Sequence, residues 1–296
     1  LPGGRQTRAV REDDGLGRAG CQRMAEAASK SGKLLEIGYQ RFYNPVYQAA
    51  YDGIVKTGVL GEVYHARLAW HRNGNWRRKE EPPPNFDPTR WGYPDWEHVV
   101  NWRLYWKYSK GLLAELASHQ VNIANWFFDA VPEAVSGTGG VYRFKDGREV
   151  EDHVYTTFEY PGGRTVVFSS IESNAFDDYY EMFMGTKGTL ILRRETDAML
   201  FEEGGEGRTA VEVSARTGPA LESSETKPQT TGARGDTASV ATVERPASYR
   251  LEISEWSAAI RTGRPLRCGP EKAMGSAFAC LAANRAVQGH ARVELT

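Results

Sequence analysis

The clearest hydrophobic pattern in the chain runs from Gly111 to Phe128, in the stretch GLLAELASHQVNIANWFF. Apolar side chains occur on nearly every side of this stretch and no proline interrupts it, which predicts a buried helix. Helical spacing places Glu115, His119 and Asn122 on one flank of that helix. Polar side chains on a buried helix need partners or a chemical role. The spacing alone leaves two interpretations open, a core histidine bonded to a neighbouring carboxylate and a catalytic group.

An alternation of helix and strand patterns precedes this stretch. Residues 21–32 predict a short helix that a glycine ends, and residues 34–40, LLEIGYQ, predict a strand. A second helix is predicted to begin at Asn44 and Pro45, because asparagine is a good N-cap and proline suits the first helical turn. Residues 62–72 then alternate between apolar and polar positions, as a half-buried strand does. Together these elements predict a partial α/β unit at the start of the fold.

Residues 73–108 break this regular pattern with five prolines and eight tryptophan or tyrosine residues. A loop of this length is usually functional rather than a simple connection. Aromatic rings beside Asn, Asp and Arg side chains suit the C–H face and the hydroxyls of a sugar. A covering layer on a sheet and a subunit interface are equally weighted alternatives. Because the loop leads directly into Gly111, we expect it to reach the polar flank of the helix and to form one pocket with it.

Short strand patterns follow the helix, and turn sequences such as DG, PGG and TKG separate them. Hairpin-length connections of this kind predict a largely antiparallel sheet. The strand patterns cover residues 134–144, 152–161, 163–174, 179–186 and 188–195, and residues 198–204 are a further candidate.

The C-terminal part of the sequence combines a polar segment with two helices. Residues 204–247 are rich in Gly, Ser, Thr and Glu and nearly empty of large apolar residues, which predicts a flexible excursion. Residues 248–263 form an amphipathic helix pattern, and residues 270–289 form another with many small residues. The predicted fold class is therefore α+β, an open and mostly antiparallel sheet backed by helices.

Composition and charge exclude several kinds of partner. The chain has 37 Lys and Arg against 38 Asp and Glu, so it presents no basic field for nucleic acid or an anionic membrane. Its three cysteines, at positions 21, 268 and 280, are widely spaced and predict neither a disulfide framework nor a structural zinc site. No apolar run approaches the roughly 18 residues of a membrane span, and the first residues lack the apolar core of a signal peptide. The expected location is the cytoplasm.

Familiar catalytic and binding motifs do not occur in the sequence. No GxGxxG follows a strand, and no GxxxxGK[ST], HExxH, GxSxG or EF-hand pattern is found. His65 and His71 would share a face of a continuous strand, but the six histidines do not cluster at ligand spacing, so we predict no metal. Asp152 and His153 are adjacent in a predicted strand and should face opposite sides. The basic run at residues 77–79 is interpreted as a solvated surface.

Several blocks of the sequence, occurring in the same order, resemble the Gfo/Idh/MocA oxidoreductases. These are NAD(P)-dependent enzymes that act mostly on sugars, inositols and their relatives. The blocks are GYQRFYNP (38–45), GVLGEVYHARLAWHR (58–72), NWRLY (101–105), LLAELASHQVNIANWF (112–127), DGREVEDHVYTTFEYPGGRTVVFSS (146–170), YEMFMGTKGTLIL (180–192) and AAIRTGRPLRCGPEKAMGS (258–276). The resemblance runs from about Cys21 to the C-terminus. It implies an N-terminal Rossmann domain followed by a domain with an open, mostly antiparallel sheet.

The resemblance also implies roles for particular residues. His119 matches the active-site histidine of the family, a general acid/base on the substrate hydroxyl or carbonyl, and Glu115 matches the carboxylate one turn before it. Tyr39, Arg41 and Asn44 match the segment that faces the nicotinamide and are therefore predicted to lie on the cofactor side. The residues predicted to lie on the substrate side are Trp96, Trp102, Arg103 and Asn122.

The sequence also departs from the family pattern. The dinucleotide fingerprint and the Glu-Lys-Pro motif, whose lysine assists the histidine, are expected upstream of Cys21 and are not found there. Asn122 stands where the family usually has aspartate, and an asparagine cannot act as a base. The expected organisation is an atypical or disordered segment at 1–19, a remnant of the dinucleotide-binding domain (its last helix and strand) at 20–43, and a substrate domain at 44–296 that includes the excursion at 204–247.

These observations predict a truncated relative of the NAD(P)-dependent sugar or inositol dehydrogenases, with His119 as acid/base. We expect the chain to bind NAD or NADP poorly on its own, because the pyrophosphate needs a Gly-rich turn and the helix N-terminus behind it. Two alternatives stay open, a non-catalytic domain that binds a sugar or oligomerises, and a glycosidase-like branch that uses NAD. The expected partners are a sugar or polyol and a second copy of the chain, paired through the open sheet face.

Overall fold

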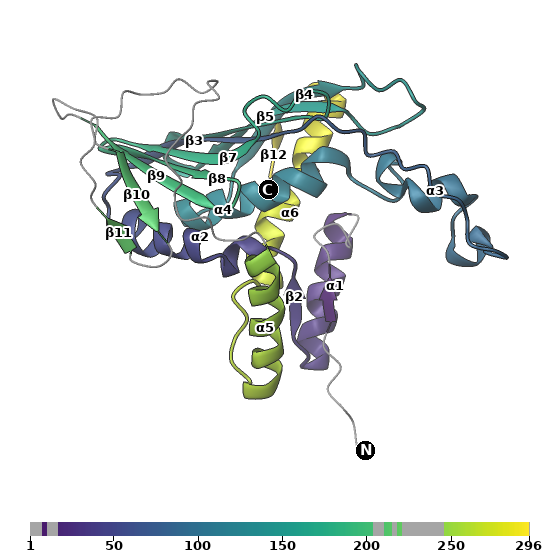
Figure 1. Cartoon of the computed structure of the whole chain (residues 1–296), viewed down its shortest axis with the longest axis horizontal. Coiled ribbons are helices and arrows are strands. Elements are labelled where there is room, and N and C mark those ends of the chain that lie inside the picture. Colours follow the sequence, from purple (N-terminus) through teal and green to yellow (C-terminus); the bar gives the residue numbers. More distant parts are fainter. Residues whose placement is uncertain (1–7, 11–16, 204–209, 215–217, 221–245, 296) are drawn as a thin grey trace.

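The body of the protein is one large sheet of ten strands, with helices on one of its faces (Figure 1). The computed structural model describes residues 8–10, 17–203, 210–214, 218–220 and 246–295. The strands of the sheet are β3 (Val63–His71), β4 (Ala134–Gly140), β5 (His153–Tyr160), β6 (Arg164–Ile171), β7 (Tyr179–Gly185), β8 (Gly188–Arg193), β9 (Asp197–Glu202), β10 (Ala210–Ser214), β11 (Gly218–Ala220) and β12 (Val293–Glu294). Their order across the sheet is β11-β10-β9-β8-β7-β3-β6-β5-β4-β12.

Neighbouring strands run antiparallel at every position in this sheet except one. The exception is the central pair β3 and β6, which is parallel with Ala66 opposite Val166. A parallel pair requires a long crossover, and here the chain leaves β3, passes through the aromatic segment and the His119 helix, and returns by way of β4 and β5. The sheet is open at both ends of the strand order. The predicted fold class is confirmed.

Two long helices cover one face of the sheet (Figure 1). They are α4 (Ser118–Phe128), which a π-helical turn (Leu113–Ala117) precedes, and α6 (Pro270–Gly289). Phe127 and Phe128 of α4 pack against Phe183 of β7, with ring centroids 4.8 Å and 6.1 Å apart. All three phenylalanines belong to one large hydrophobic cluster between the helices and the sheet. This cluster fixes the helix that carries His119.

A smaller unit extends away from the sheet (Figure 1). It contains α1 (Arg18–Ser31), β2 (Leu35–Ile37) with the short parallel strand β1 (Arg8–Val10), and α5 (Pro246–Thr262). Gly32 ends α1 in the left-handed conformation, with φ at 63°, as its position in the sequence predicts. The predicted helix of this region is confirmed, and the strand predicted over residues 34–40 is confirmed only for Leu35–Ile37, because a 3-10 helix begins at Gln40. Among the described residues, no helix is both long and apolar enough to cross a membrane.

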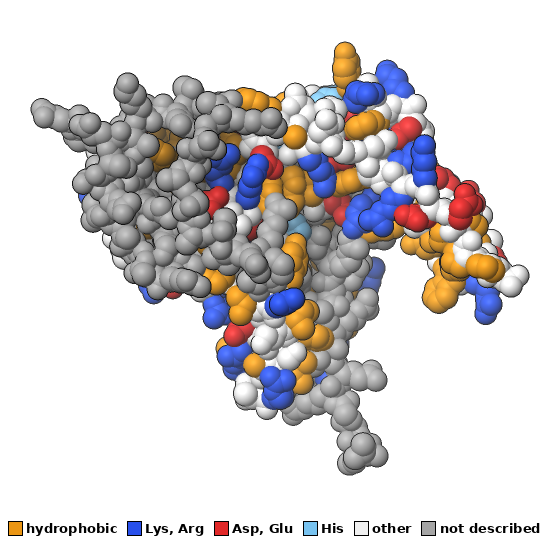
Figure 2. Space-filling model, viewed as in Figure 1, with side chains coloured by type: hydrophobic (Ala, Val, Ile, Leu, Met, Phe, Trp, Pro, Cys, Tyr) orange, Lys and Arg blue, Asp and Glu red, His pale blue; other side chains and the backbone are white. Residues whose placement is uncertain are grey.

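The aromatic residues 73–108 form a projection that we call the arm (Figures 1 and 2). It contains α3 (Trp96–Val100) and two single turns of 3-10 helix, Pro88–Trp91 and Trp102–Leu104. Trp91 lies 71% exposed on it. The arm therefore does not form a layer over the sheet, and its last turn brings the chain back towards α4.

Parts of the two segments predicted to be disordered or flexible lie outside the described residues. Within the range 1–19, residues 8–10 form β1 and α1 begins at Arg18. Within the range 204–247, residues 210–214 and 218–220 add β10 and β11 to one edge of the sheet. The helix predicted to begin at Asn44 and Pro45 is α-helical only over α2 (Pro45–Ala50). It continues as a π-helical turn, Tyr51–Val55.

Glu36 in β2 is expected to make the stability of the fold depend on pH. The residue is 2% exposed, and its Oε1 accepts a hydrogen bond from the Tyr43 hydroxyl at 2.6 Å. Burial raises the pKa of Glu36 from 4.5 to about 7, and the hydrogen bond from Tyr43 offsets only part of this shift. Between these two values the unfolded chain has lost the proton while the folded chain keeps it. The free energy of unfolding should therefore fall as the pH rises through this window, by about 3 kcal/mol.

The variant Glu36→Gln keeps an acceptor for Tyr43 and removes the titration. We expect its free energy of unfolding to change less between about pH 5 and about pH 8 than that of the parent chain, measured by urea denaturation. Glu26→Gln, at an exposed position of α1, is the matched control and should follow the parent chain. Equal pH dependence in Glu36→Gln and the parent would show that Glu36 does not retain its proton in the fold.

Candidate active site

The helix predicted to carry the chemistry starts from a constrained turn. Gly111 has φ at 63°, in the left-handed region, and a side chain there would lie 3.4 Å from both Val150 and Glu151. The next turn is π-helical, so Glu115 and His119 do not follow regular α-helical spacing. Single π-helical turns occur often at functional sites. Glu115, His119 and Asn122 therefore contact different parts of the structure.

Glu115 meets the end of the arm. Its Oε2 lies 3.0 Å from Nε of Arg103, and its Oε1 accepts a hydrogen bond from the Ser109 hydroxyl at 3.3 Å. Glu115 is 5% exposed, whereas the Arg103 side chain is partly exposed, so the charged pair lies at the edge of the buried region. The guanidinium carbon of Arg103 also stacks 4.3 Å from the centre of a Trp102 ring. The structure thus brings together three of the predicted site residues, Trp102, Arg103 and Glu115.

His119 lies between aromatic rings from two other elements. Tyr39 presents its ring edge to the imidazole, with centroids 5.4 Å apart and planes at 89°, and Trp70 of β3 lies 6.1 Å away. The imidazole is only partly buried. Tyr39, from the segment after β2, is 1% exposed, and its hydroxyl is 3.2 Å from the Ser276 hydroxyl of α6. Tyr39 and His119 therefore lie side by side, although they come from different elements.

Asn122 is directed towards α6. Its Nδ2 donates to the Ser276 hydroxyl at 3.0 Å and to the backbone oxygen of Lys272 at 3.3 Å. The residue is 1% exposed. A polar chain therefore runs from Asn122 through Ser276 to Tyr39, one ring contact away from His119. Asn122 therefore supports the region of His119 from the side of α6, whereas Glu115 contacts the arm.

Arg41 is enclosed in the interior. It is 1% exposed, and its guanidinium lies 3.3 Å from Glu181 and 3.1 Å from Glu195. Its Nε also lies 3.3 Å from the Tyr47 hydroxyl, which in turn donates to Glu181 at 2.6 Å. Burial lowers the pKa of Arg41, but Glu195 and Glu181 raise it by more, so it stays charged. Its guanidinium carbon lies 5.1 Å from the centre of the Trp70 ring, which also borders His119.

Asn44 is likewise occupied by protein partners. Its Oδ1 accepts from the backbone nitrogen of Val46, which makes it the predicted N-cap of α2. Its Nδ2 donates to the backbone oxygen of Glu195 at 2.8 Å and to the Ser248 hydroxyl at 2.9 Å. Of the three residues predicted to face a cofactor, Asn44 thus has its side-chain polar groups bonded inside the protein, and Arg41 is buried between the carboxylates of Glu181 and Glu195. Only Tyr39 borders the His119 region.

Trp96 lies at the start of α3, well out on the arm (Figure 1). Its Nε1 donates to the backbone oxygen of Glu80 at 2.6 Å, and its ring meets the edge of Phe86 with centroids 5.1 Å apart. These contacts stabilise the arm itself. Trp96 is therefore separated from the group of Trp102, Arg103 and Glu115.

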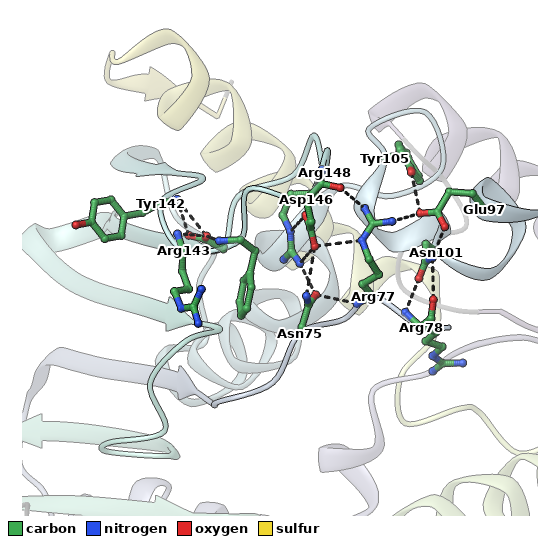
Figure 3. Close-up of polar contacts among 12 residues, drawn as sticks. Asn75, Arg77, Arg78, Glu97, Asn101, Tyr105, Tyr142, Arg143, Asp146 and Arg148 are labelled. Atoms are coloured by element: carbon green, nitrogen blue, oxygen red, sulfur yellow. Dashed lines mark hydrogen bonds and ion pairs between the residues drawn. The ribbon is translucent and has the colours of Figure 1, made fainter. Parts of the chain in front are cut away.

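A polar network fixes the base of the arm to the loop after β4 (Figure 3). Arg77 bridges Asp146, at 3.1 Å, and Glu97, and Arg148 binds the same Asp146 at 2.9 Å. The Arg148 hydrogen bond, together with that of Arg77, overcomes desolvation and lowers the pKa of Asp146. The interpretation of residues 77–79 as a solvated surface was wrong for Arg77, because carboxylates from distant segments surround it.

The same network continues to the candidate site. Asn101, which is 2% exposed, accepts from the backbone nitrogen of Arg78 at 2.7 Å and donates to Glu97 at 2.8 Å (Figure 3). It immediately precedes Trp102 and Arg103 in the chain. The network therefore sets where the arm returns and places Arg103 against Glu115.

Asp152 closes the neighbouring loop. It accepts hydrogen bonds from the backbone nitrogens of Tyr142, Arg143 and Phe144, at 2.6 Å for Arg143. Its Oδ1 also lies 2.9 Å from Nδ1 of His153. The prediction that these adjacent side chains face apart was wrong, because Asp152 precedes the regular part of β5. Both are engaged in holding the loop.

His71, which the sequence analysis considered together with His65, has protein atoms beside both of its ring nitrogens. His71 has its Nδ1 2.8 Å from the backbone oxygen of Phe176 and its Nε2 2.8 Å from the Ser169 hydroxyl. Across the part of the chain that the structure describes, no group of three or more His, Cys, Asp and Glu residues is placed to hold a metal ion.

Comparison with known proteins identifies the family of this chain. A family model described as the C-terminal alpha/beta domain of the Gfo/Idh/MocA oxidoreductase family matches residues 53–295. The chain belongs to the Gfo/Idh/MocA oxidoreductase family. The match covers α4, its His119 and the whole ten-stranded sheet.

Solved structures of Gfo/Idh/MocA type share the fold at low sequence identity. Levoglucosan dehydrogenase, in complex with NADH and L-sorbose, superposes with a TM-score of 0.74 at 14% identity, over 99% of this chain and 74% of that one. An oxidoreductase domain protein from Kribbella flavida gives 0.73 at 17% identity, over 98% and 74%. Aldose-aldose oxidoreductase from Caulobacter crescentus, complexed with glycerol, gives 0.64 at 20% identity, over 98% and 72%.

A curated relative is similar over part of its sequence. The 2,7-anhydro-N-acetylneuraminate hydratase of Escherichia coli K12 is 24% identical over 190 residues, which are 63% of this chain and 45% of that protein. The chain thus spans less than half the length of this Gfo/Idh/MocA relative.

Several residues of the site were not predicted from the sequence. Trp70 borders both His119 and Arg41, Ser109 binds Glu115, and Ser276 links Asn122 to Tyr39. Trp70 ends an alternating strand pattern beside the aromatic segment, which is a weak signal for a site position. Ser109 and Ser276 have no distinguishing spacing, because their partners come from other elements.

Proposed function

We propose that this chain forms the substrate side of a sugar or polyol oxidoreductase, with His119 as the group that exchanges a proton with a substrate hydroxyl. The observation that carries the proposal is the convergence of a partly exposed imidazole with Tyr39 and Trp70, one turn after Glu115, which Arg103 of the arm contacts. An imidazole titrates near neutral pH and suits proton transfer, and a charged pair at the rim can bind hydroxyls. The related structures support a sugar or polyol, since one holds L-sorbose and another holds glycerol.

The residues of this chain do not fit a dinucleotide well. Structures in the family contain NADH or NAD+, which supports use of NAD(P) by the family. In this chain, however, Arg41 and Asn44 are each 1% exposed and already bonded to Glu195. The proposal therefore assigns no step to a nucleotide on this chain. It treats residues 20–43 as the edge of a dinucleotide-binding domain and residues 44–296 as the substrate domain.

The open face of the sheet is proposed to pair with a second copy of the chain. Tyr155 of β5 is 46% exposed and lies on the face of its strand opposite to Val154 and Phe158, which pack in the core under the helices. Exposed aromatic side chains on a flat sheet favour association. A non-catalytic sugar-binding or oligomerisation domain remains the second candidate function, because the same sheet and the same rim residues serve it.

Sugar binding at the His119 site can be tested on the chain alone. D-glucose, myo-inositol and glycerol would be titrated while the imidazole signals are followed by NMR, with His119→Gln identifying the His119 signal. We expect at least one of the three compounds to shift that signal in a saturable way. Arg103→Met should weaken this binding about tenfold, because a hydrogen bond to a charged group is lost.

Arg90→Met provides the matched control, since Arg90 is an exposed arginine of the same arm and should leave binding unchanged. A His119 signal that no polyol shifts would contradict the proposed substrate class. Binding that Arg103→Met and Arg90→Met affect equally would remove Arg103 from the site.

A further inference from the structure

A cavity of about 850 Å³ lies between α6, the start of α1 and the turn that joins the arm to α4. Its walls combine apolar side chains of α6, Phe278 and Leu281, with Trp106, Lys110 and the carboxylate of Glu151. The volume is within the range of small-molecule sites, and a mixture of apolar walls and a few polar groups is typical of them. None of the residues proposed above to bind a sugar lines this cavity.

Two buried hydrogen-bond acceptors in its lining have no partner among the described residues. They are Oε2 of Glu151 and Oδ1 of Asn284, on residues that are 8% and 5% exposed. The amide nitrogen of Asn284 donates to the backbone oxygen of Lys110 at 2.8 Å, which fixes the orientation of its side chain. Buried acceptors are normally satisfied, because an unmet one costs free energy. The cavity therefore has a place for a hydrogen-bond donor.

Glu151 also lacks a cation in contact with it. In the described part of the chain no ion pair to Glu151 is present, and burial raises the pKa of its carboxyl, so its ionised form needs a positively charged partner. The nearby lysine is engaged elsewhere, since Nζ of Lys110 donates to the backbone oxygen of Trp106 at 2.6 Å. A donor that carries a positive charge would match the Glu151 carboxylate and would supply N–H groups for the acceptors of this cavity.

We propose that this cavity binds a small molecule that carries a protonated primary amine, held by Glu151 and Asn284. The amine has three N–H donors and no acceptor, which matches two acceptors that lack partners. Arg18 and Arg285 line the same cavity from exposed positions. They favour a ligand whose other end is neutral or anionic. This site is separate from the proposed sugar site and does not depend on it.

The test follows the Trp106 indole signal of the isotope-labelled chain by NMR during titration with L-glutamine, 4-aminobutyrate and D-glucosamine. We expect at least one of these amines to shift the signal in a saturable way. N,N,N-trimethylglycine has the positive charge without the N–H donors, and myo-inositol has hydroxyls without the charge, so neither should bind. No saturable shift by any of the amines, or a shift by myo-inositol alone, would overturn the proposal.

Two variants localise the effect. Glu151→Gln keeps the shape of the side chain and removes its charge, and we expect it to weaken amine binding about tenfold. Glu62→Gln, at an exposed position next to β3, is the matched control, and His119→Gln should also leave amine binding unchanged. Equal affinity in Glu151→Gln and the parent chain would overturn the assignment. The comparison of amines with trimethylglycine needs no variant, so it decides the proposal even if Glu151→Gln fails to fold.

Discussion

Replacing Arg41 by methionine is expected to destabilise the protein by about 3–5 kcal/mol, because it leaves two buried carboxylates without their cation. Arg41 is 1% exposed, and Glu181 and Glu195 are 0% and 7% exposed. The carboxylates come from β7 and from the turn after β8, so the guanidinium connects the segment after β2 to the sheet. Urea denaturation of the parent and the variant measures the loss.

Two further variants test whether Arg41 stabilises the fold or serves a cofactor. Arg23→Met, at an exposed position of α1, is the matched control and should change the free energy of unfolding by less than about 0.5 kcal/mol. Adding Glu181→Gln to Arg41→Met removes one of the unbalanced charges and should recover part of the loss. A stable Arg41→Met chain would contradict the structural role and favour the alternative that Arg41 serves a cofactor.

Phe183→Ala is expected to cost about 3–5 kcal/mol as well, since it opens a cavity where α4 meets the sheet. Phe183 is 0% exposed, and its ring contacts Phe127 and Phe128 of α4 at 4.8 Å and 6.1 Å between centroids. The substitution loosens the helix that carries His119, so the stability loss should be accompanied by broadening of the His119 imidazole signal. Thermal or urea unfolding and the same NMR spectrum give both readings.

Phe176→Ala is the control for that experiment. Phe176 is 57% exposed in the turn before β7, so its removal should leave both the stability and the His119 signal nearly unchanged. A similar cost for Phe176→Ala and Phe183→Ala would mean that α4 is not held by the phenylalanine contacts.

The elements of the fold could be predicted because their signals are local. An alternating pattern marks β3, and short strand patterns between turn sequences mark β4 to β9. Asn44 with Pro45 marks the start of α2, where Asn44 does accept from the Val46 nitrogen. What the sequence could not show is the second role of Asn44, whose Nδ2 reaches Glu195 and Ser248 from distant parts of the chain. Partners 151 and 204 residues away leave no periodic signal.

In the candidate site, too, only the local features could be predicted from the sequence. Helical spacing predicted that Glu115, His119 and Asn122 share a flank, but the π-helical turn directs Glu115 to Arg103 while Asn122 binds Ser276. A π-helical turn has no sequence signature in this stretch, because its residues are the same good helix formers that an α-helix uses. The pairing of Arg103 with Glu115 depends on where the arm returns, which the network of Arg77, Asp146 and Glu97 sets.

The proposal that this chain supplies the substrate side of the site, and holds a dinucleotide poorly, is tested most directly by titrating the purified chain with NADH and NADPH. Nucleotide fluorescence would be followed with and without a polyol that shifts the His119 signal. We predict polyol binding without nucleotide and no saturable nucleotide binding in the micromolar range. Micromolar binding of NADH or NADPH to the chain alone would contradict the proposal, because it would require a dinucleotide cradle that Tyr39, Arg41 and Asn44 do not provide.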